Sequence, residues 1–377
     1  MPENSNQERN AIDQPNESSI KPRILNLLRS LKRRVQLVRG YGTFISGLFT
    51  SYWYDIKRYH RAASKGYMAV CFGESRYTEL KSWIAADAHK IEKGMALRAP
   101  RPGFGRPVVR RLVEQVERFH RDFGPEPVTE IAINTLTTYC AYSQSHGIEE
   151  EALLADVARL SSPLASDRDH CMGGVIEIDR EIVLQSARFP GAAAFFNSRY
   201  SIRNFSDEPV SMDVVEKAIA LAQKTPSVCN RQSWKAYVFL DGDEPQQVLA
   251  CQQGNRGFGD TAAGALVITS DLETFFSYGE RNQGYIDGGM FAMSVVYGLH
   301  AQGVGSCCLN WCVDISLEKE LRTVAEIPEH EAVIMMIAIG HLPASVTVAQ
   351  SVRKPLADVC IPGRLRSSGG DSSREGA

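Results

Sequence analysis

The chain has 377 residues, of which 44% are hydrophobic and 23% charged, and its formal net charge at pH 7 is −2. Single cores stop growing at roughly 250–300 residues, so two domains are expected. The small net charge gives no reason to expect nucleic acid as a partner. The nine scattered cysteines exclude a dense disulfide framework and favour reduced thiols in the cytoplasm.

The N-terminal region begins with a polar segment and continues with a strongly basic one. Residues 1–20 are poor in apolar side chains, which predicts a disordered tail, and they show no secretory leader. Residues 21–65 contain eleven Lys or Arg and one acid, a net charge of +10. Apolar residues recur at helical spacing over 23–39, and an aromatic-rich stretch follows to residue 54.

Two interpretations of segment 23–54 stay open. A basic amphipathic helix beside aromatic side chains can lie on an anionic membrane surface, which would make the protein peripheral to the inner face of the membrane. The same helix can instead pack on the protein's own second domain, with its basic face in water. The apolar stretch is shorter than the roughly 20 residues that cross a bilayer.

The apolar spacing predicts more helices before residue 180. They are expected at 75–92, 107–123, 127–143 and 149–160. Residues 21–180 should therefore form a mainly α-helical domain. His89 and Glu92 are three apart on one helix face, but such a pair more often makes an intrahelical polar contact than a metal site, and no metal site is predicted.

The pattern changes after residue 180, where helices and strands are mixed. The predicted helices are 212–224 and 285–302, and the predicted strands are 235–240, 263–270, 305–311 and 332–340. The run 263–270 is almost continuously apolar, as a fully buried strand should be. An α+β domain is therefore expected over 186–362, followed by a disordered tail at 363–377.

A first candidate motif is the sequence Arg-Tyr-Ser-Ile-Arg at 199–203. In an extended conformation, Arg199, Ser201 and Arg203 alternate onto one side of the chain. Two guanidinium groups and a hydroxyl are what a phosphate monoester and its sugar chain require. Taken alone, such a triplet is more often a solvated surface.

A second candidate motif is Pro-Ser-Val-Cys-Asn-Arg-Gln-Ser-Trp at 226–234, between a predicted helix and a predicted strand. The amides of Asn230 and Gln232 offer donors and acceptors together, which matches a heterocycle edge such as the O2–N3–O4 side of a flavin. Trp234 begins the strand and is expected in the core.

In this order, the two motifs resemble those of the nitroreductase-like FMN-dependent oxidoreductases. Asn255, Asp287-Gly288-Gly289 and Arg353-Lys354-Pro355-Leu356 follow in the order of that family. The resemblance covers about 189–362. It implies a nitroreductase-like FMN-binding fold, in which helices flank a central, mostly antiparallel sheet, preceded here by the helical domain.

The resemblance implies roles for residues around the phosphate and the pyrimidine edge of FMN. Arg199 and Arg353 would hold the phosphate. Ser201 would contact the phosphate or the ribityl chain, and Arg203 would lie near the ribityl chain and the ring's O2. Asn255 would hydrogen-bond the pyrimidine edge.

A second group of residues follows from the family's dimeric architecture. Ser227, Asn230 and Gln232 would reach the cofactor from a partner subunit, since the family's FMN sites form at a homodimer seam. The loop of Asn310 and Trp311 would lie beside flavin N5. Because the flavin carries out the electron transfer, no side chain is assigned as a catalytic acid or base.

Some positions depart from the family pattern or permit two explanations. Ser233 stands where the family usually has Pro, and Phe258 where some members carry a Lys that faces the flavin. Phe275, Phe276 and Tyr278 follow the apolar strand, where they can fold over the ring or serve only as packing residues.

We expect an oxidoreductase that transfers hydride from NAD(P)H through flavin N5 to a small conjugated acceptor such as a quinone or nitroaromatic. One alternative is a flavoenzyme with a dedicated biosynthetic substrate, for example in polysaccharide biosynthesis, because the helical domain is foreign to the minimal family. Another is a membrane-surface or assembly protein with a structural flavin, which the basic segment motivates. The sequence does not identify the acceptor, the preferred nucleotide or the role of the helical domain.

Overall fold

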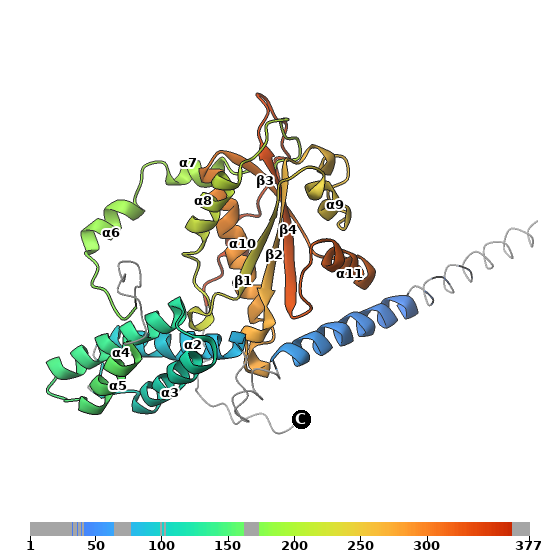
Figure 1. The fold of residues 1–377 in the computed structure, drawn as a ribbon. Coiled ribbons are helices and arrows are strands. Elements are labelled where there is room, and N and C mark those ends of the chain that lie inside the picture. Colours follow the sequence, from blue (N-terminus) through green and yellow to red (C-terminus); the bar gives the residue numbers. More distant parts are fainter. Residues whose placement is uncertain are drawn as a thin grey trace, which may run out of the picture.

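The chain consists of a helical bundle and an α+β part in a computed structural model (Figure 1). The residues that the structure describes are Lys32, Gln36, Arg39, 41–63, 77–98, 100–101, 103–161 and 173–363. Nearly all of the predicted tails and most of the predicted 23–39 helix lie outside them.

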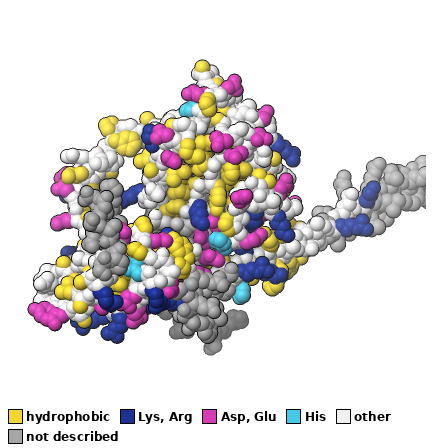
Figure 2. All heavy atoms as spheres, viewed as in Figure 1, with side chains coloured by type: hydrophobic (Ala, Val, Ile, Leu, Met, Phe, Trp, Pro, Cys, Tyr) yellow, Lys and Arg dark blue, Asp and Glu magenta, His cyan; other side chains and the backbone are white. Residues whose placement is uncertain are grey.

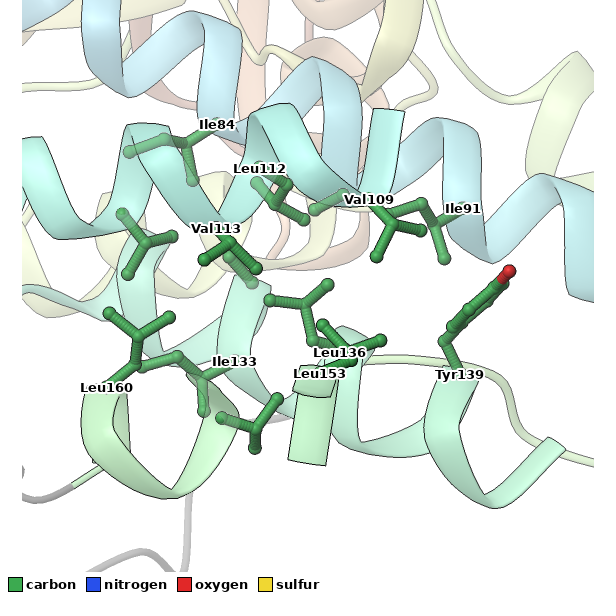
Figure 3. Packing of buried hydrophobic residues seen from close by; sticks show 14 of the residues in the cluster. Ile84, Ile91, Val109, Leu112, Val113, Ile133, Leu136, Tyr139, Leu153 and Leu160 are labelled. Carbon is green, nitrogen blue, oxygen red and sulfur yellow. The ribbon is translucent and has the colours of Figure 1, made fainter. Parts of the chain in front are cut away.

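The helical bundle is formed by α2 (Tyr77–Met95), α3 (Arg106–Phe123), α4 (Pro127–Ser145) and α5 (Glu151–Ser161). The four predicted helices are thus confirmed to within a few residues. Their apolar stripes meet in one core (Figure 3), which includes Ile84, Ile91, Leu112, Ile133, Leu136 and Tyr139. Complete burial of one such side chain contributes about 1.5–3 kcal/mol.

The sheet of the α+β part has the strand order β1-β2-β4-β3, and every neighbouring pair is antiparallel. Its strands are β1 (Trp234–Phe239), β2 (Gly264–Asp271), β3 (Val304–Leu309) and β4 (Glu331–His341). All residues of β2 are buried, as its apolar run predicts. The α+β prediction and the antiparallel sheet are therefore confirmed.

Two layers of helices cover the two faces of this sheet (Figure 1). On one face, α8 (Met212–Ala222) and α10 (Gln283–Ala301) pack against Leu266 and Ile337. Alternate residues such as Val267 point to the other face, toward α9 (Glu244–Ala250) and α11 (Ile315–Val324). Small residues bring α8 and α10 close together, because a Cβ at Gly298 would clash with the backbone of Ala218.

Several short elements have no counterpart among the predicted ones. The helices without a predicted counterpart are α6 (Arg180–Ala187), α7 (Ala192–Asn197), α9, α11 and α12 (Leu356–Val359). Single-turn 3₁₀ helices occur at η1 (Val228–Asn230), η2 (Gly259–Thr261), η3 (Leu272–Thr274) and η4 (Tyr278–Glu280). The helices α6, α7 and α12 bury no residue, so they lack the apolar stripe that would reveal them.

Residues 41–63 are helical and dock on the α+β part through their C-terminal end. There, Arg58 pairs with Glu318 of α11 at 2.5 Å, and Ala62 packs in a cluster with Leu272. The aromatic side chains farther toward the N-terminus, such as Trp53, are exposed. These contacts lie outside segment 23–54, so both interpretations of that segment stay predictions. No described helix is long and apolar enough to span a bilayer.

Candidate functional site

The motif Arg199–Arg203 lies along β3, an edge strand of the sheet. Ser201 forms a parallel bridge with Ser306, and the Ile202 N–H donates to the Ser306 carbonyl at 3.0 Å. Ile202 points into the core, whereas Arg199 is half-buried and Arg203 exposed. Burial along the motif does not alternate strictly, because Tyr200 is exposed while Ile202 is buried, so the placement of Arg199, Ser201 and Arg203 on one side stays a prediction.

The two arginines of this motif place positive charge beside the middle of β3. Burial raises the pKa of the Cys307 and Cys308 thiols, and the guanidinium groups of Arg203 and Arg199, respectively, act against that rise. Among the described residues, neither Arg199 nor Arg203 has a carboxylate partner. Two unpaired guanidinium groups next to hydroxyl groups form a donor set that suits an anionic ester.

The loop after β3 lies against the Asn255 turn. The buried Gln252 donates its side-chain N–H to the Asn310 carbonyl at 2.9 Å. The Asn255 amide donates to the carbonyls of Leu249 and Gln252, at 2.5 and 3.1 Å, so its carbonyl oxygen is the group left for a ligand. Trp311 follows in the same loop, and its indole N–H is buried without a hydrogen-bond partner in the described structure.

The loop from Ser227 to Gln232 precedes β1, the opposite edge strand. The Val228 N–H donates to Asp287 of α10 at 3.1 Å, and the Gln232 N–H donates to the Ser227 hydroxyl at 3.0 Å. The side chains of Asn230 and Gln232 are exposed. With three strand spacings between the edges, β1 and β3 lie about 14 Å apart. One chain therefore does not bring the two motifs together.

A cavity of about 450 Å³ lies between this loop and the helical bundle. Asn230 and Gln232 line one side, and α2 contributes Lys81 and His89. Ile131 of α4 forms part of an apolar wall. His89 also contacts Glu92 at 3.3 Å, which is the intrahelical contact expected from their spacing.

The aromatic residues after β2 serve mainly as packing residues. Phe275 is fully buried, and Phe276 stacks on Trp83 of α2. Tyr278 is 89% exposed. Trp234 is buried and stacks on Phe291, as expected of a core residue.

Arg353 lies in the exposed segment 351–363 and donates to the Ser351 carbonyl at 2.5 Å. Its predicted phosphate contact stays a prediction.

Two residues that hold the site were missed by sequence reasoning. Gln252 ties the Asn255 turn to the Asn310 loop, and buried Asp287 holds the Val228 loop against α10. Asp287 belongs to a quoted family motif, but its structural task was not predicted. Gln252 has no sequence signal beyond a polar residue shortly before Gly254.

The observed donors fit FMN. The guanidinium pair suits the phosphate, and the exposed amides suit the ring edge. A buried N–H without a partner costs free energy, so the Trp311 indole favours a bound acceptor in this loop. These residues lie on both edges of the sheet.

Comparison with known proteins gives a family for part of the chain. Residues 197–341 match the Nitroreductase family. Human iodotyrosine deiodinase 1 is 22% identical over 210 residues, which are 48% of this chain and 71% of that protein. Iodotyrosine deiodinase of Nematostella vectensis is 21% identical over 200 residues, covering 45% and 75% of the two chains.

Solved nitroreductase structures also resemble part of the chain. An FMN-dependent nitroreductase from Clostridium difficile R20291 has a TM-score of 0.37 and 22% identity, with 42% of this chain and 92% of that chain covered. A nitroreductase from Desulfovibrio desulfuricans, solved in complex with FMN, has a TM-score of 0.40 and 22% identity, with coverages of 48% and 99%.

Proposed function

We propose that this chain, in which residues 197–341 form a Nitroreductase-family region, is an FMN-dependent oxidoreductase that passes electrons from NAD(P)H to a small conjugated acceptor. The main observation behind this proposal concerns Arg199 and Arg203, which lie beside β3. Their guanidinium groups have no carboxylate partner among the described residues. The loop after β3 adds the unpaired indole N–H of Trp311.

In this proposal the residues of the chain bind FMN and orient it. Arg199 and Arg353 would hold the phosphate, and Ser201 would contact the phosphate or the ribityl chain. Arg203 would lie near the ribityl chain and the ring's O2, where its positive charge would favour the anionic reduced ring. Bound FMN supplies hydride acceptance and donation. No side chain is assigned as a general acid or base.

We place the complete site at a homodimer seam, because the two motifs occupy opposite edges of one sheet. Ser227, Asn230 and Gln232 of one copy would meet the β3 edge of the other. The helix α10 exposes Ile286, Met290 and Met293 at helical spacing, and hydrophobic side chains gather on this face in Figure 2. An exposed apolar stripe of this kind favours a protein partner.

The electron acceptor is proposed to be a quinone or a nitroaromatic compound. The names of two relatives describe iodotyrosine deiodination, so halogenated phenols belong among the acceptors to test. A dedicated substrate is the second candidate, favoured by the cavity that the helical bundle forms over Asn230 and Gln232. Rapid turnover of many unrelated quinones and nitroaromatics would remove that candidate.

We also propose that the enzyme is cytoplasmic and attaches to an anionic membrane surface, which the exposed aromatic residues Phe44, Phe49 and Trp53 support. Cosedimentation with phosphatidylserine vesicles at low salt tests it, with phosphatidylcholine vesicles as the control. Equal recovery with both vesicles would contradict attachment.

An anaerobic absorbance titration tests the main proposal. Purified protein should show the near-ultraviolet and blue bands of oxidised flavin, and NADH or NADPH should bleach them. Bands that persist would exclude pyridine nucleotide as the donor. Protein that stays colourless after FMN is added would overturn the proposal.

A further inference from the structure

Three side chains connect the helical bundle to the loop that precedes β1. Trp83 of α2 stacks on Phe276, with ring centroids 4.2 Å apart and planes inclined by 12°. The guanidinium group of Arg231 lies 4.8 Å from the Phe276 ring and 5.2 Å from Phe275. We call these three side chains the interdomain stack: Trp83, Phe276 and Arg231.

Arg231 is a buried anchor within the loop. Its side chain is 1% exposed, pairs with Glu280 and donates to the Thr274 carbonyl at 2.7 Å. Burial alone would raise the pKa of Glu280, but the hydrogen bonds from Arg231 and from the Phe276 N–H bring it below its ordinary value. The buried charges are thus compensated, and the guanidinium group is held in place.

The loop around Arg231 needs such an anchor. Cys229, Asn230 and Gln232 all have left-handed backbone angles, with φ of 50°, 52° and 49°. Each non-glycine residue in this region costs about 1–3 kcal/mol and persists only where its surroundings impose it. Arg231 lies between the two amide residues, so its position decides where their exposed side chains point.

On the side of the helical bundle, charged residues also surround Trp83 of the interdomain stack. Arg111 and Lys90 approach the Trp83 ring at 5.8 and 5.7 Å. Both donate to Asp87, a fully buried carboxylate, at distances between 2.6 and 2.9 Å. A rigid arrangement of rings and charges therefore runs from the bundle to the loop.

We propose that Trp83 is a positioning residue through which the helical bundle fixes the Asn230 and Gln232 amides for contact with the flavin ring. This inference rests on the proposed function, because it assumes that the loop contacts FMN. It assigns the helical bundle a task in the cofactor site: preorganising a strained loop reduces the ordering cost of binding.

The test compares Trp83→Leu, which removes the stacked ring, with Trp83→Phe, which keeps a ring. Phe123→Leu, an aromatic deletion in the same bundle away from the interdomain stack, is the matched control. The measurements are the FMN dissociation constant by fluorescence titration and the midpoint potential of the bound flavin. An aromatic pair is worth a roughly two- to ten-fold change in a binding constant.

We expect Trp83→Leu to weaken FMN binding by that factor and to shift the midpoint potential, while Trp83→Phe and Phe123→Leu stay near wild type. Arg231→Lys provides a second variant, since it keeps the charge but loses the planar guanidinium, and it should weaken FMN binding with Trp83 intact. A folded Trp83→Leu or Arg231→Lys protein with wild-type affinity and potential overturns the inference. Wild-type protein that does not bind FMN overturns the proposed function instead.

Discussion

Three arginines occupy two opposite environments, and the difference separates structural from ligand-binding candidates. Arg231 is enclosed by Glu280 and by backbone carbonyls, so its donors are already used. Arg199 and Arg203 have no carboxylate partner among the described residues. Unused guanidinium donors beside a sheet edge are available to an anion.

Replacing Arg199 by Gln should remove one charge-assisted contact to the phosphate. We expect FMN affinity to fall roughly 10- to 100-fold, which corresponds to about 1.5–3 kcal/mol. Fluorescence titration measures the change. Arg110→Gln, a substitution of an exposed arginine on α3, should leave the affinity unchanged. Equal affinities of the two variants would remove Arg199 from the phosphate site.

Glu331 is a single buried carboxylate that connects three strands. It accepts from Lys235 at 2.5 Å, from Tyr237 at 3.0 Å and from Thr269 at 2.6 Å. Burial and the Glu331 carboxylate both raise the pKa of Tyr237, so that phenol stays protonated. The buried Glu331 carboxyl group is therefore structural, because its hydrogen bonds go to neighbouring strands.

Replacing Glu331 by Ala leaves buried donors without a partner. We expect the free energy of unfolding to fall by about 3 kcal/mol, measured by urea denaturation with flavin absent. Glu329→Ala, an exposed neighbour, is the control. A loss below about 0.5 kcal/mol for Glu331→Ala would show that water replaces the carboxylate.

Helices α3 and α4 are joined through their adjacent ends. The His120 side chain in the last turn of α3 contacts the Thr129 hydroxyl in the first turn of α4 at 2.9 Å. Glu126 and Thr129 form a capping box at the start of α4. Burial lowers the pKa of His120 below 6.5, so the folded bundle favours the neutral ring.

This contact predicts a pH dependence of bundle stability. Below pH 6.5 the unfolded chain binds a proton that the folded His120 resists, so stability should fall as pH decreases through 6.5 and should be retained above it. Urea denaturation at a series of pH values measures the slope. His120→Gln should flatten it, whereas His146→Gln, at an exposed position, should not. An unchanged slope in His120→Gln would assign the effect to other groups.

At the scale of the whole molecule, the two motifs lie on opposite edges of one sheet. The β1 edge carries the amide loop and the β3 edge carries the arginines. The helix α10 exposes apolar side chains such as Met290, and we propose that a second copy covers them. Cofactor binding and dimerisation should therefore depend on each other.

A charge among the exposed apolar residues of α10 should prevent the proposed dimer from forming. We expect Met290→Glu to shift the protein to monomer and to weaken FMN binding with it, because burying an unpaired carboxylate is costly. Light scattering coupled to size-exclusion chromatography gives the mass. Met212→Glu, at a similarly exposed methionine on α8, is the control. A monomeric Met290→Glu protein that binds FMN with wild-type affinity would contradict a cofactor site at a homodimer interface.

Local patterns predicted the long elements well. The helices α2, α3, α4, α8 and α10 and all four strands follow from apolar spacing or continuous apolar runs. The arginine motif lies beside β3, and the placement of its three polar side chains on one side stays a prediction. Short helices such as α6 were missed because they bury nothing, so they carry no pattern.

The sequence alone determined the α+β class, the helical region before it and the residues that resemble a flavin site. These properties depend on the spacing of side chains along the chain, which local backbone geometry converts directly into faces and strands. Only the tertiary structure decided that the two motifs lie on opposite edges and that Trp83 reaches Phe276 and, through it, Arg231. Strand order and contacts between distant segments depend on which surfaces complement one another in three dimensions, and no periodicity records that.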